Sequence, residues 1–180
     1  MIYQTLIPTP LGQMTACATE QGLCMLEFPR PERIHFHMNA LQKNLGTSIQ
    51  PVSDNNHPVF TLLKEQLTAY FDHKLQTFQM PLFLVGTDFQ KQAWHALQQI
   101  PYGQTRSYAQ QAVAVDNPAA TRAVAAANGC NRISIVVPCH RVIGSDGSLT
   151  GFGGELWRKK ALLELEINHP DNQETDFLLE

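Results

Sequence analysis

The stretch ISIVVPCHRVIG, residues 133–144, decides how the rest of this chain is interpreted. Residues 133–137 are apolar and rich in β-branched side chains, so they predict a buried extended segment. Pro138 cannot donate to a strand ladder, and it therefore ends regular pairing and redirects the chain. The Cys-His-Arg triplet at 139–141 then places a thiol, an imidazole and a guanidinium side by side. This juxtaposition indicates that the thiol has a chemical function.

A nucleophilic role for Cys139 requires a base, because an ordinary thiol with a pKa of about 8.5 is mostly protonated at neutral pH. His140 is the candidate base. Neighbouring side chains of an extended segment point to opposite sides, so we expect a water to bridge Cys139 and His140. A carboxylate must then orient the imidazole. Glu164 and Glu166 are the candidates, and their spacing does not distinguish them.

The other three cysteines, at positions 17, 24 and 130, predict structural thiols. Four cysteines in a chain of this type do not predict a disulfide framework. Cys17, Cys24, His35 and His37 could be metal ligands, but their spacing fits no standard zinc pattern, so we expect neither a metal nor another cofactor. We expect the remaining histidines to be surface or helix-flank residues: His57, His73, His95 and His169.

Composition indicates an ordinary globular protein of 180 residues, 43% of them hydrophobic. No stretch approaches the roughly 20 apolar residues of a membrane span, and the first residues do not resemble a signal peptide, so we expect a cytoplasmic protein. We also expect the protein to be a monomer. Residues 86–160 carry eight Lys and Arg against four Asp and Glu. A modestly basic segment is compatible with a nucleic-acid interface, although it is more often a solvated surface.

The first half of the chain predicts a small α/β domain over residues 1–86. Three short strands separated by turns predict an antiparallel sheet, at residues 2–7, 14–18 and 23–28. Apolar residues at helical spacing predict helices over residues 34–45 and 59–71. Residues 80–85 predict a strand or an extended connector, and Gly86 marks the expected boundary.

The second half, residues 87–168, predicts a mainly helical domain. Capping-box patterns begin two helices, Thr87 with Gln90 and Ser107 with Gln110. A third helix is expected over 118–128, with proline at its first position, and a last one over 156–167. Two short helices joined by a tight turn favour a helix-turn-helix. The acidic segment 169–180 predicts a loose tail.

The third of these helices is almost entirely alanine, with Arg122 as its one charged side chain. Such a helix can simply pack closely against its neighbours. Alternatively, its small residues let the backbone approach a nucleic-acid groove while Arg122 projects inward. The helix-turn-helix setting favours the second interpretation.

These motifs together resemble the O6-alkylguanine-DNA alkyltransferases, also called methylated-DNA-protein-cysteine methyltransferases. The resemblance is strongest around Pro138-Cys139-His140-Arg141-Val142, and it covers nearly the whole chain. Further matching motifs are Ala127-Asn128-Gly129, Asn131, Ile100-Pro101-Tyr102-Gly103, Thr105-Arg106-Ser107-Tyr108, and Arg158, Lys159, Leu162, Leu163 and Glu166. The resemblance implies a ribonuclease H-like α/β domain followed by a winged helix-turn-helix domain.

The function that the resemblance implies is irreversible transfer of an alkyl group from O6-alkylguanine in double-stranded DNA to Cys139, after the base is flipped out through the minor groove. O4-alkylthymine is a further possible substrate, and no obligatory protein partner is implied. His140 would take the thiol proton through a water, Glu166 would orient His140, Asn131 would hold the turn and Tyr108 would donate to the leaving guanine. The implied DNA contacts are Thr121, Arg122, Ala123, Ala126, Ala127 and Arg141, with Arg122 filling the gap left by the base. The implied substrate pocket comprises Pro138, Val142, Phe152, Gly153 and Gly154.

Three positions depart from the family's usual pattern. Phe152 stands where tyrosine is common, Arg132 replaces a common proline and Glu155 a common glycine. We expect Glu155 to weaken DNA binding, because its carboxylate lies near a polyanion. Alkyltransferase-like proteins, which bind alkylated DNA without repairing it, carry tryptophan at the position of Cys139. The two alternatives are therefore a non-catalytic, damage-sensing DNA binder and a cysteine hydrolase, which would turn over repeatedly.

Overall fold

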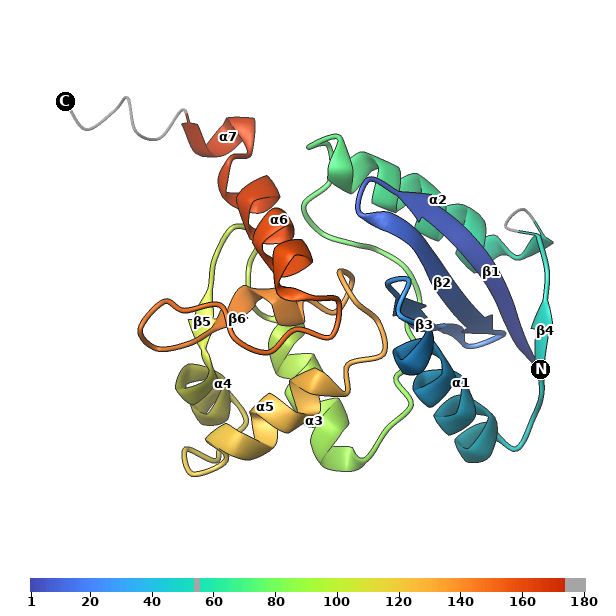
Figure 1. Ribbon diagram of the computed structural model, residues 1–180, viewed down its shortest axis with the longest axis horizontal. Coiled ribbons are helices and arrows are strands. Elements are labelled where there is room, and N and C mark those ends of the chain that lie inside the picture. Colours follow the sequence, from blue (N-terminus) through green and yellow to red (C-terminus); the bar gives the residue numbers. More distant parts are fainter. Residues whose placement is uncertain (54–55, 174–180) are drawn as a thin grey trace.

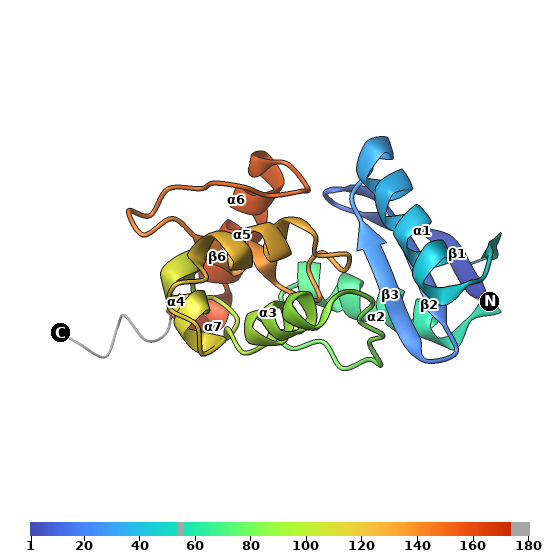
Figure 2. The ribbon, with the colours of Figure 1, turned by 90° about the horizontal axis from the view of Figure 1, so that it is seen from below.

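The computed structural model describes residues 1–53 and 56–173. A four-stranded sheet with its two helices occupies one end of the molecule, and a cluster of shorter helices occupies the other (Figures 1 and 2). The predicted fold class, a small α/β unit followed by a mainly helical helix-turn-helix unit, is confirmed. Among the described residues no helix is long and apolar enough to span a membrane.

The sheet comprises β1 (Ile2–Thr9), β2 (Gly12–Thr19), β3 (Gly22–Glu27) and β4 (Ile49–Pro51), in the order β3-β2-β1-β4. The first three strands are antiparallel neighbours, as predicted, and the short β4 runs parallel to β1. Alternation along β2 sends Met14, Ala16 and Ala18 to one face and Cys17 to the other.

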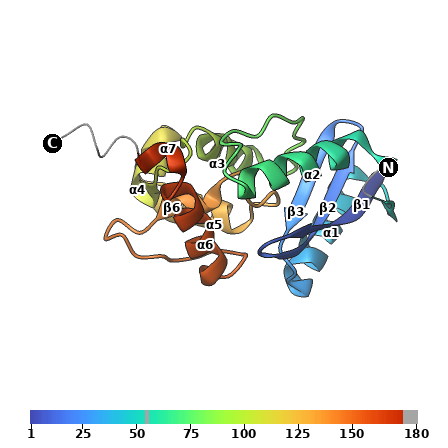
Figure 3. The same ribbon diagram turned by 90° about the horizontal axis from the view of Figure 1, so that it is seen from above.

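Helix α2 (Pro58–Phe71) covers the first of these faces, and α1 (Pro31–Leu45) covers the second. Figure 3 shows the two helices on opposite sides of the sheet. Cys17 and Cys24 are buried beneath α1, and the Cys24 thiol donates to the Cys17 carbonyl at 3.4 Å. These two cysteines are therefore structural, as predicted.

The helical unit contains α3 (Asp88–Gln98), α4 (Tyr108–Ala114), α5 (Thr121–Gly129), α6 (Leu156–Ile167) and the short α7 (Pro170–Gln173). Both predicted capping boxes are present at the starts of α3 and α4. Two short strands, β5 (Arg106–Ser107) and β6 (Val142–Ile143), pair in parallel beside the helix-turn-helix formed by α4 and α5.

The prediction of an extended segment over residues 133–137 was wrong. Ile133 makes one isolated bridge to Leu26, and the chain then turns. The Val137 N–H donates to the Ile133 carbonyl at 3.0 Å, and Ile135 adopts a left-handed φ of 71°. The β-branched residues of this stretch therefore reflect burial inside a tight turn, not pairing in a sheet.

Two smaller expectations also need correction. Helix α5 begins at Thr121 instead of Pro118, because the Ala120 N–H donates to the Asn117 carbonyl at 2.9 Å and closes a separate turn. The segment after Asn168 begins with α7, and residues 174–180 lie outside the described part. His57 and His169 flank helices, as predicted, and both are buried: His57 caps α2, and His169 donates to the His73 carbonyl at 2.9 Å.

Candidate active site

Cys139 begins a single 3₁₀ turn, Cys139–Arg141, that connects Pro138 to β6. The turn is closed by the Arg141 N–H, which donates to the Pro138 carbonyl at 3.1 Å. Successive side chains of a 3₁₀ helix are separated by about 120°. Cys139 and His140 therefore do not point to opposite sides, as they would in an extended segment. The thiol is nearly buried, with 9% of Cys139 exposed.

Asn131 holds the loop that leads to this turn. Its side-chain amide donates to the Val137 carbonyl at 2.8 Å, and its oxygen accepts from the Ile133 N–H at 3.0 Å. Burial raises the pKa of the Cys139 thiol, while a hydrogen bond from Asn131 and the charge of Lys159 act in the opposite direction. Because the net pKa is raised, the thiol is protonated at rest and needs a base to become a nucleophile.

His140 is fully buried and contacts a carboxylate through one ring nitrogen. Its Nε2 lies 2.7 Å from Glu166 Oε1. Its Nδ1 is buried and has no hydrogen-bond partner in the described part of the chain. Because Nε2 must donate to an ionised carboxylate, Nδ1 is left as an acceptor that can take a proton. Burial lowers the pKa of His140 despite the opposing influence of Glu166, so the ring is neutral before reaction.

Glu166 is the carboxylate that spacing alone had not distinguished from Glu164. Glu164 is exposed and pairs with Lys160 at 3.7 Å, whereas Glu166 is fully buried. Arg141 makes a bidentate contact with Glu166, from Nε to Oε2 and from a terminal nitrogen to Oε1, both at 2.9 Å. The Gly103 N–H and the Tyr70 hydroxyl also donate to this carboxylate, at 3.3 and 2.8 Å.

The electrostatics of this cluster keep Glu166 ionised. Burial by itself raises the pKa of the carboxyl group, but the charges and hydrogen bonds of His140 and Arg141 more than offset it. The net pKa lies well below the usual range of a glutamate. A fixed negative charge therefore faces the imidazole, ready to stabilise a proton that arrives on it.

Tyr108, the first residue of α4, contacts the loop that follows β6. Its hydroxyl donates to the Thr150 carbonyl at 2.9 Å, and burial raises its pKa, so the hydroxyl stays protonated. Lys159, which the sequence reasoning gave no role, is fully buried beside it. The Lys159 ammonium donates to the carbonyls of Val142 and Thr150 at 2.6 and 2.9 Å. This lysine fixes the loop to the turn that carries Cys139.

A cavity of about 420 Å³ lies between α5 and this loop. Its lining residues are Tyr108, Thr121, Arg122, Ala125, Gly129, Thr150, Gly151 and Phe152. It therefore brings together residues predicted for catalysis, DNA contact and substrate binding. Pro138 and Val142 are buried, and Gly154 lies so close to the rings of Phe28 and Phe152 that a Cβ there would collide with both.

The exposed face of α5 carries Arg122, Ala123 and Ala126, with Thr121 partly exposed. Two residues expected to contact DNA lie elsewhere. Ala127 is 3% exposed, and its carbonyl accepts from the Trp94 indole at 2.9 Å, so it belongs to the core. Arg141 is buried, and its guanidinium is bound to Glu166 and to the Ile100 carbonyl. It therefore supports the catalytic cluster.

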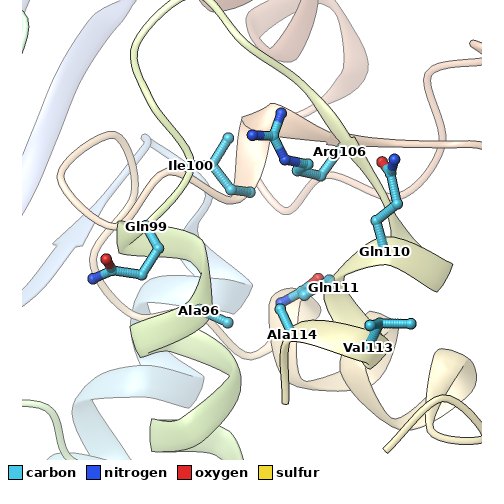
Figure 4. A pocket seen from close by; sticks show the side chains of 8 residues that line it. All are labelled: Ala96, Gln99, Ile100, Arg106, Gln110, Gln111, Val113 and Ala114. Atoms are coloured by element: carbon cyan, nitrogen blue, oxygen red, sulfur yellow. The ribbon is translucent and has the colours of Figure 1, made fainter. Parts of the chain in front are cut away.

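A second pocket, of about 350 Å³, lies between α3 and α4 (Figure 4). Its lining residues are Ala96, Gln99, Ile100, Arg106, Gln110, Gln111, Val113 and Ala114. None of these was predicted as a site residue. The cavity beside α5, in contrast, is lined by the predicted site residues Tyr108, Arg122 and Phe152, and we take that cavity as the candidate substrate site.

The N-terminal unit contacts the substrate loop through α1 and the residue before it. Arg30 donates to the Gly153 carbonyl at 2.9 Å, and the Arg33 guanidinium fills the space next to the Gly153 Cα. Glu155 has a left-handed φ of 76°, a conformation suited to glycine. Its carboxylate accepts from the Trp157 indole at 2.8 Å and lies 3.9 Å from Arg30.

Arg132, the second departure, connects the turn region to the N-terminal unit. It is 7% exposed and donates to the Val85 carbonyl at 2.9 Å. Its terminal nitrogen lies 2.7 Å from Nδ1 of the buried His37, which in turn lies 3.4 Å from the buried Glu27. Neither His37 nor His35 forms a metal cluster with Cys17 or Cys24, and no group of three or more such ligands occurs within residues 1–53 and 56–173.

Family models match both halves of the chain. Residues 2–84 match the ribonuclease-like domain of 6-O-methylguanine DNA methyltransferase, and residues 88–168 match the DNA-binding domain of the same family.

Related proteins align over almost their full length. A methylated-DNA–protein-cysteine methyltransferase of Mycobacterium bovis is 58% identical over 170 residues, which are 92% of this chain and 93% of that protein. One from Methanosarcina barkeri is 41% identical over 169 residues, 93% of this chain and 99% of that protein. A crystal structure of Mycobacterium tuberculosis OGT in complex with DNA superposes on this chain with a TM-score of 0.77. That superposition covers 93% of this chain and 94% of the other, with 41% identity.

Proposed function

Because this chain belongs to the 6-O-methylguanine DNA methyltransferase family, a family of DNA repair transferases, we propose that it moves an alkyl group from O6-alkylguanine in DNA irreversibly to Cys139. The observation that carries this proposal is the geometry of His140. One ring nitrogen is fixed by Glu166 at 2.7 Å. The other is buried, without a hydrogen-bond partner among the described residues, and on the same short turn as a nearly buried thiol.

The first step activates the thiol. The Cys139 proton passes through a bridging water to His140 Nδ1, and the resulting imidazolium is stabilised by Glu166. Arg141 and the Gly103 N–H hold the carboxylate in place. Asn131 favours the thiolate, because its hydrogen bond lowers the pKa of the thiol against the effect of burial.

The second step transfers the alkyl group. The thiolate attacks the alkyl carbon, the new sulfur–carbon bond forms as the carbon–O6 bond breaks, and the electron pair of that bond moves onto the guanine. Tyr108 donates a proton to the purine ring, so that guanine leaves as a neutral base and the thiol proton replaces the one that Tyr108 has given up. The thioether on Cys139 has no leaving group, so each protein molecule acts once.

Access to the alkylated base requires its removal from the stack. We propose that α5 enters the minor groove, where the small side chains of Ala123 and Ala126 let the helix approach closely. Arg122 then fills the gap in the duplex, and Thr121 contacts the backbone. Both Thr121 and Arg122 line the cavity of about 420 Å³ together with Tyr108 and Phe152, which supports entry of the flipped base between α5 and the substrate loop.

The remaining expectations are part of the same proposal: domains over residues 1–86 and 87–168 and a monomeric, cytoplasmic protein. The proposed alkyl transfer is tested by a single-turnover assay with a duplex that contains one O6-methylguanine, combined with a binding measurement on the same duplex. Transfer limited to one equivalent supports the proposal. Binding without transfer would favour a damage-sensing DNA binder, and repeated turnover would favour a cysteine hydrolase.

A further inference from the structure

Tyr70 lies in α2, a helix of the N-terminal unit, yet its hydroxyl belongs to the catalytic cluster. The side chain is fully buried, and the hydroxyl donates to Glu166 Oε1 at 2.8 Å. This is the oxygen that accepts from His140 Nε2 at 2.7 Å. Three donors therefore share this carboxylate oxygen: Tyr70, His140 and, at 2.9 Å, a terminal nitrogen of Arg141.

The tyrosine ring is held by other aromatic rings. Phe71 and Phe78 each lie 5.3 Å from it between ring centroids, and Tyr102 lies 6.1 Å from it with its ring nearly perpendicular. Because these contacts depend on the ring and not on the hydroxyl, the ring position does not explain why a tyrosine stands here. The hydroxyl instead contacts Glu166, and the reason for a tyrosine at this position lies in that hydrogen bond.

The titratable groups around His140 and Glu166 come from three elements and one loop. Glu166 and Lys159 face the imidazole from α6, and Arg141 faces both side chains from the 3₁₀ turn. Tyr70 from α2 and Tyr102 from the loop after α3 complete the set around the carboxylate. Burial raises the pKa of Tyr70, and the negative Glu166 raises it further, so the hydroxyl remains a donor at every physiological pH.

We propose that Tyr70 is a positioning residue of the proton relay, and that its hydrogen bond to Glu166 Oε1 sets the pH at which His140 can accept the thiol proton. This inference rests on the proposed function. A hydrogen bond to a carboxylate draws negative charge away from the other donors on the same oxygen, here His140 and Arg141. With the hydroxyl present, Glu166 stabilises the imidazolium less strongly, and His140 stays neutral to a lower pH.

The sign of the effect follows from the role of His140. The ring must be neutral before it can take a proton, so the transfer rate falls as pH drops through its pKa. Removal of the Tyr70 hydroxyl concentrates the charge of Glu166 on His140 and favours the imidazolium. The acid limb of the pH–rate profile therefore moves to higher pH. A role limited to packing would change the rate or the stability without moving this limb.

The experiment measures single-turnover transfer from a duplex with one O6-methylguanine, from about pH 5 to about pH 9. For Tyr70→Phe we expect the acid limb to move upward by about half a unit to one unit. Tyr102→Phe is the matched control, because the Tyr102 hydroxyl is buried without a hydrogen-bond partner in the described part of the chain. Its profile should coincide with that of the wild type. An acid limb of Tyr70→Phe at the wild-type pH would overturn the proposal.

A second measurement covers the case in which Tyr70→Phe folds poorly. Site-specific replacement of Tyr70 by 3-fluorotyrosine retains the ring contacts and makes the hydroxyl a stronger donor, so the acid limb should move to lower pH. The His140 ring nitrogens, followed by NMR in the same proteins, should titrate with shifts of the same sign. Unchanged titration in both variants would refute a role for Tyr70, whereas a wild-type protein that transfers nothing at any pH would refute the proposed function instead.

Discussion

Glu166 Oε1 lies 2.7 Å from His140 Nε2, and both side chains are fully buried. Burial of a carboxylate is costly unless the charge is paired and hydrogen-bonded, and Glu166 is bound by Arg141, Gly103 and Tyr70 as well. This one contact connects the stability of the protein to its chemistry.

Glu166→Gln should slow alkyl transfer by about a hundredfold, because a neutral amide cannot stabilise the imidazolium. Single-turnover rates measure the effect. Glu164→Gln is the control, since Glu164 is exposed on the same helix and should leave the rate unchanged. A Glu166→Gln rate within a factor of about two of the wild type would contradict the role of Glu166.

The stability of the protein should fall as the pH drops below about 6.5. His140 has a lowered pKa in the folded state, so the unfolded chain takes up its proton first and is favoured as pH decreases. Glu166 also has a lowered pKa, and its contribution is present above the pKa of an unfolded glutamate, about 4.3, and is lost below it. Urea unfolding at several pH values measures this slope. Glu166→Gln should flatten the lower part of the curve, and an unchanged slope would count against the buried pair.

Cys139→Ala and Arg122→Ala should separate chemistry from DNA binding. Cys139→Ala removes the acceptor sulfur and should abolish transfer while changing the affinity for an O6-methylguanine duplex by less than about threefold. Arg122→Ala should weaken binding by about tenfold and slow transfer as well, because the gap in the duplex is no longer filled. Titration of a fluorescent duplex measures both. Equal losses of binding would show that the two roles are wrongly assigned.

Glu155→Gly should stabilise the protein by about 1 kcal/mol, because φ of 76° is unstrained for glycine. It should also tighten DNA binding, since a negative charge beside the substrate loop is removed. Glu155→Gln separates the two effects: it keeps the backbone strain and removes only the charge. Thermal unfolding and salt-dependent binding distinguish them, and a less stable Glu155→Gly would indicate that the contacts with Arg30 and Trp157 outweigh the strain.

Arg132→Ala should destabilise the protein by about 1–3 kcal/mol, because the Val85 carbonyl and His37 lose a buried partner. Arg106→Ala is the control: the Arg106 guanidinium donates to the Thr105 carbonyl and the Gln104 side chain, both within two residues of it in sequence, and we expect a change in stability of less than about 0.5 kcal/mol. Denaturant unfolding compares them. Equal effects would mean that Arg132 does not connect the two units.

The sequence predicted most elements of the fold because their signals are local. Capping boxes marked the starts of α3 and α4, and turn residues marked the limits of β1 to β3. The turn at residues 133–137 was missed because burial selects the same β-branched residues in a buried turn as in a strand. The Asn131 side chain closes that turn from outside the segment, and no pattern within 133–137 reveals it.

The site was predicted in part. Lys159, Leu162, Leu163 and Glu166 recur at the spacing of one helix face, and all four are buried. That periodicity places Lys159 and Glu166 on the buried face of the helix and Glu164 off it. The signal was overlooked because Lys159 and Glu166 are charged and charged residues are usually exposed. Tyr70 could not be found in this way, because its contact with Glu166 depends on how two distant units pack.

The most direct test of alkyl transfer to Cys139 is intact-protein mass spectrometry after incubation with a duplex that contains one O6-methylguanine, followed by peptide mapping. We predict that each protein molecule gains the mass of one methyl group, that the group maps to Cys139, and that excess duplex produces no second addition. A protein that binds the duplex and remains unmodified, or one that carries the methyl group on another residue, would contradict the assignment.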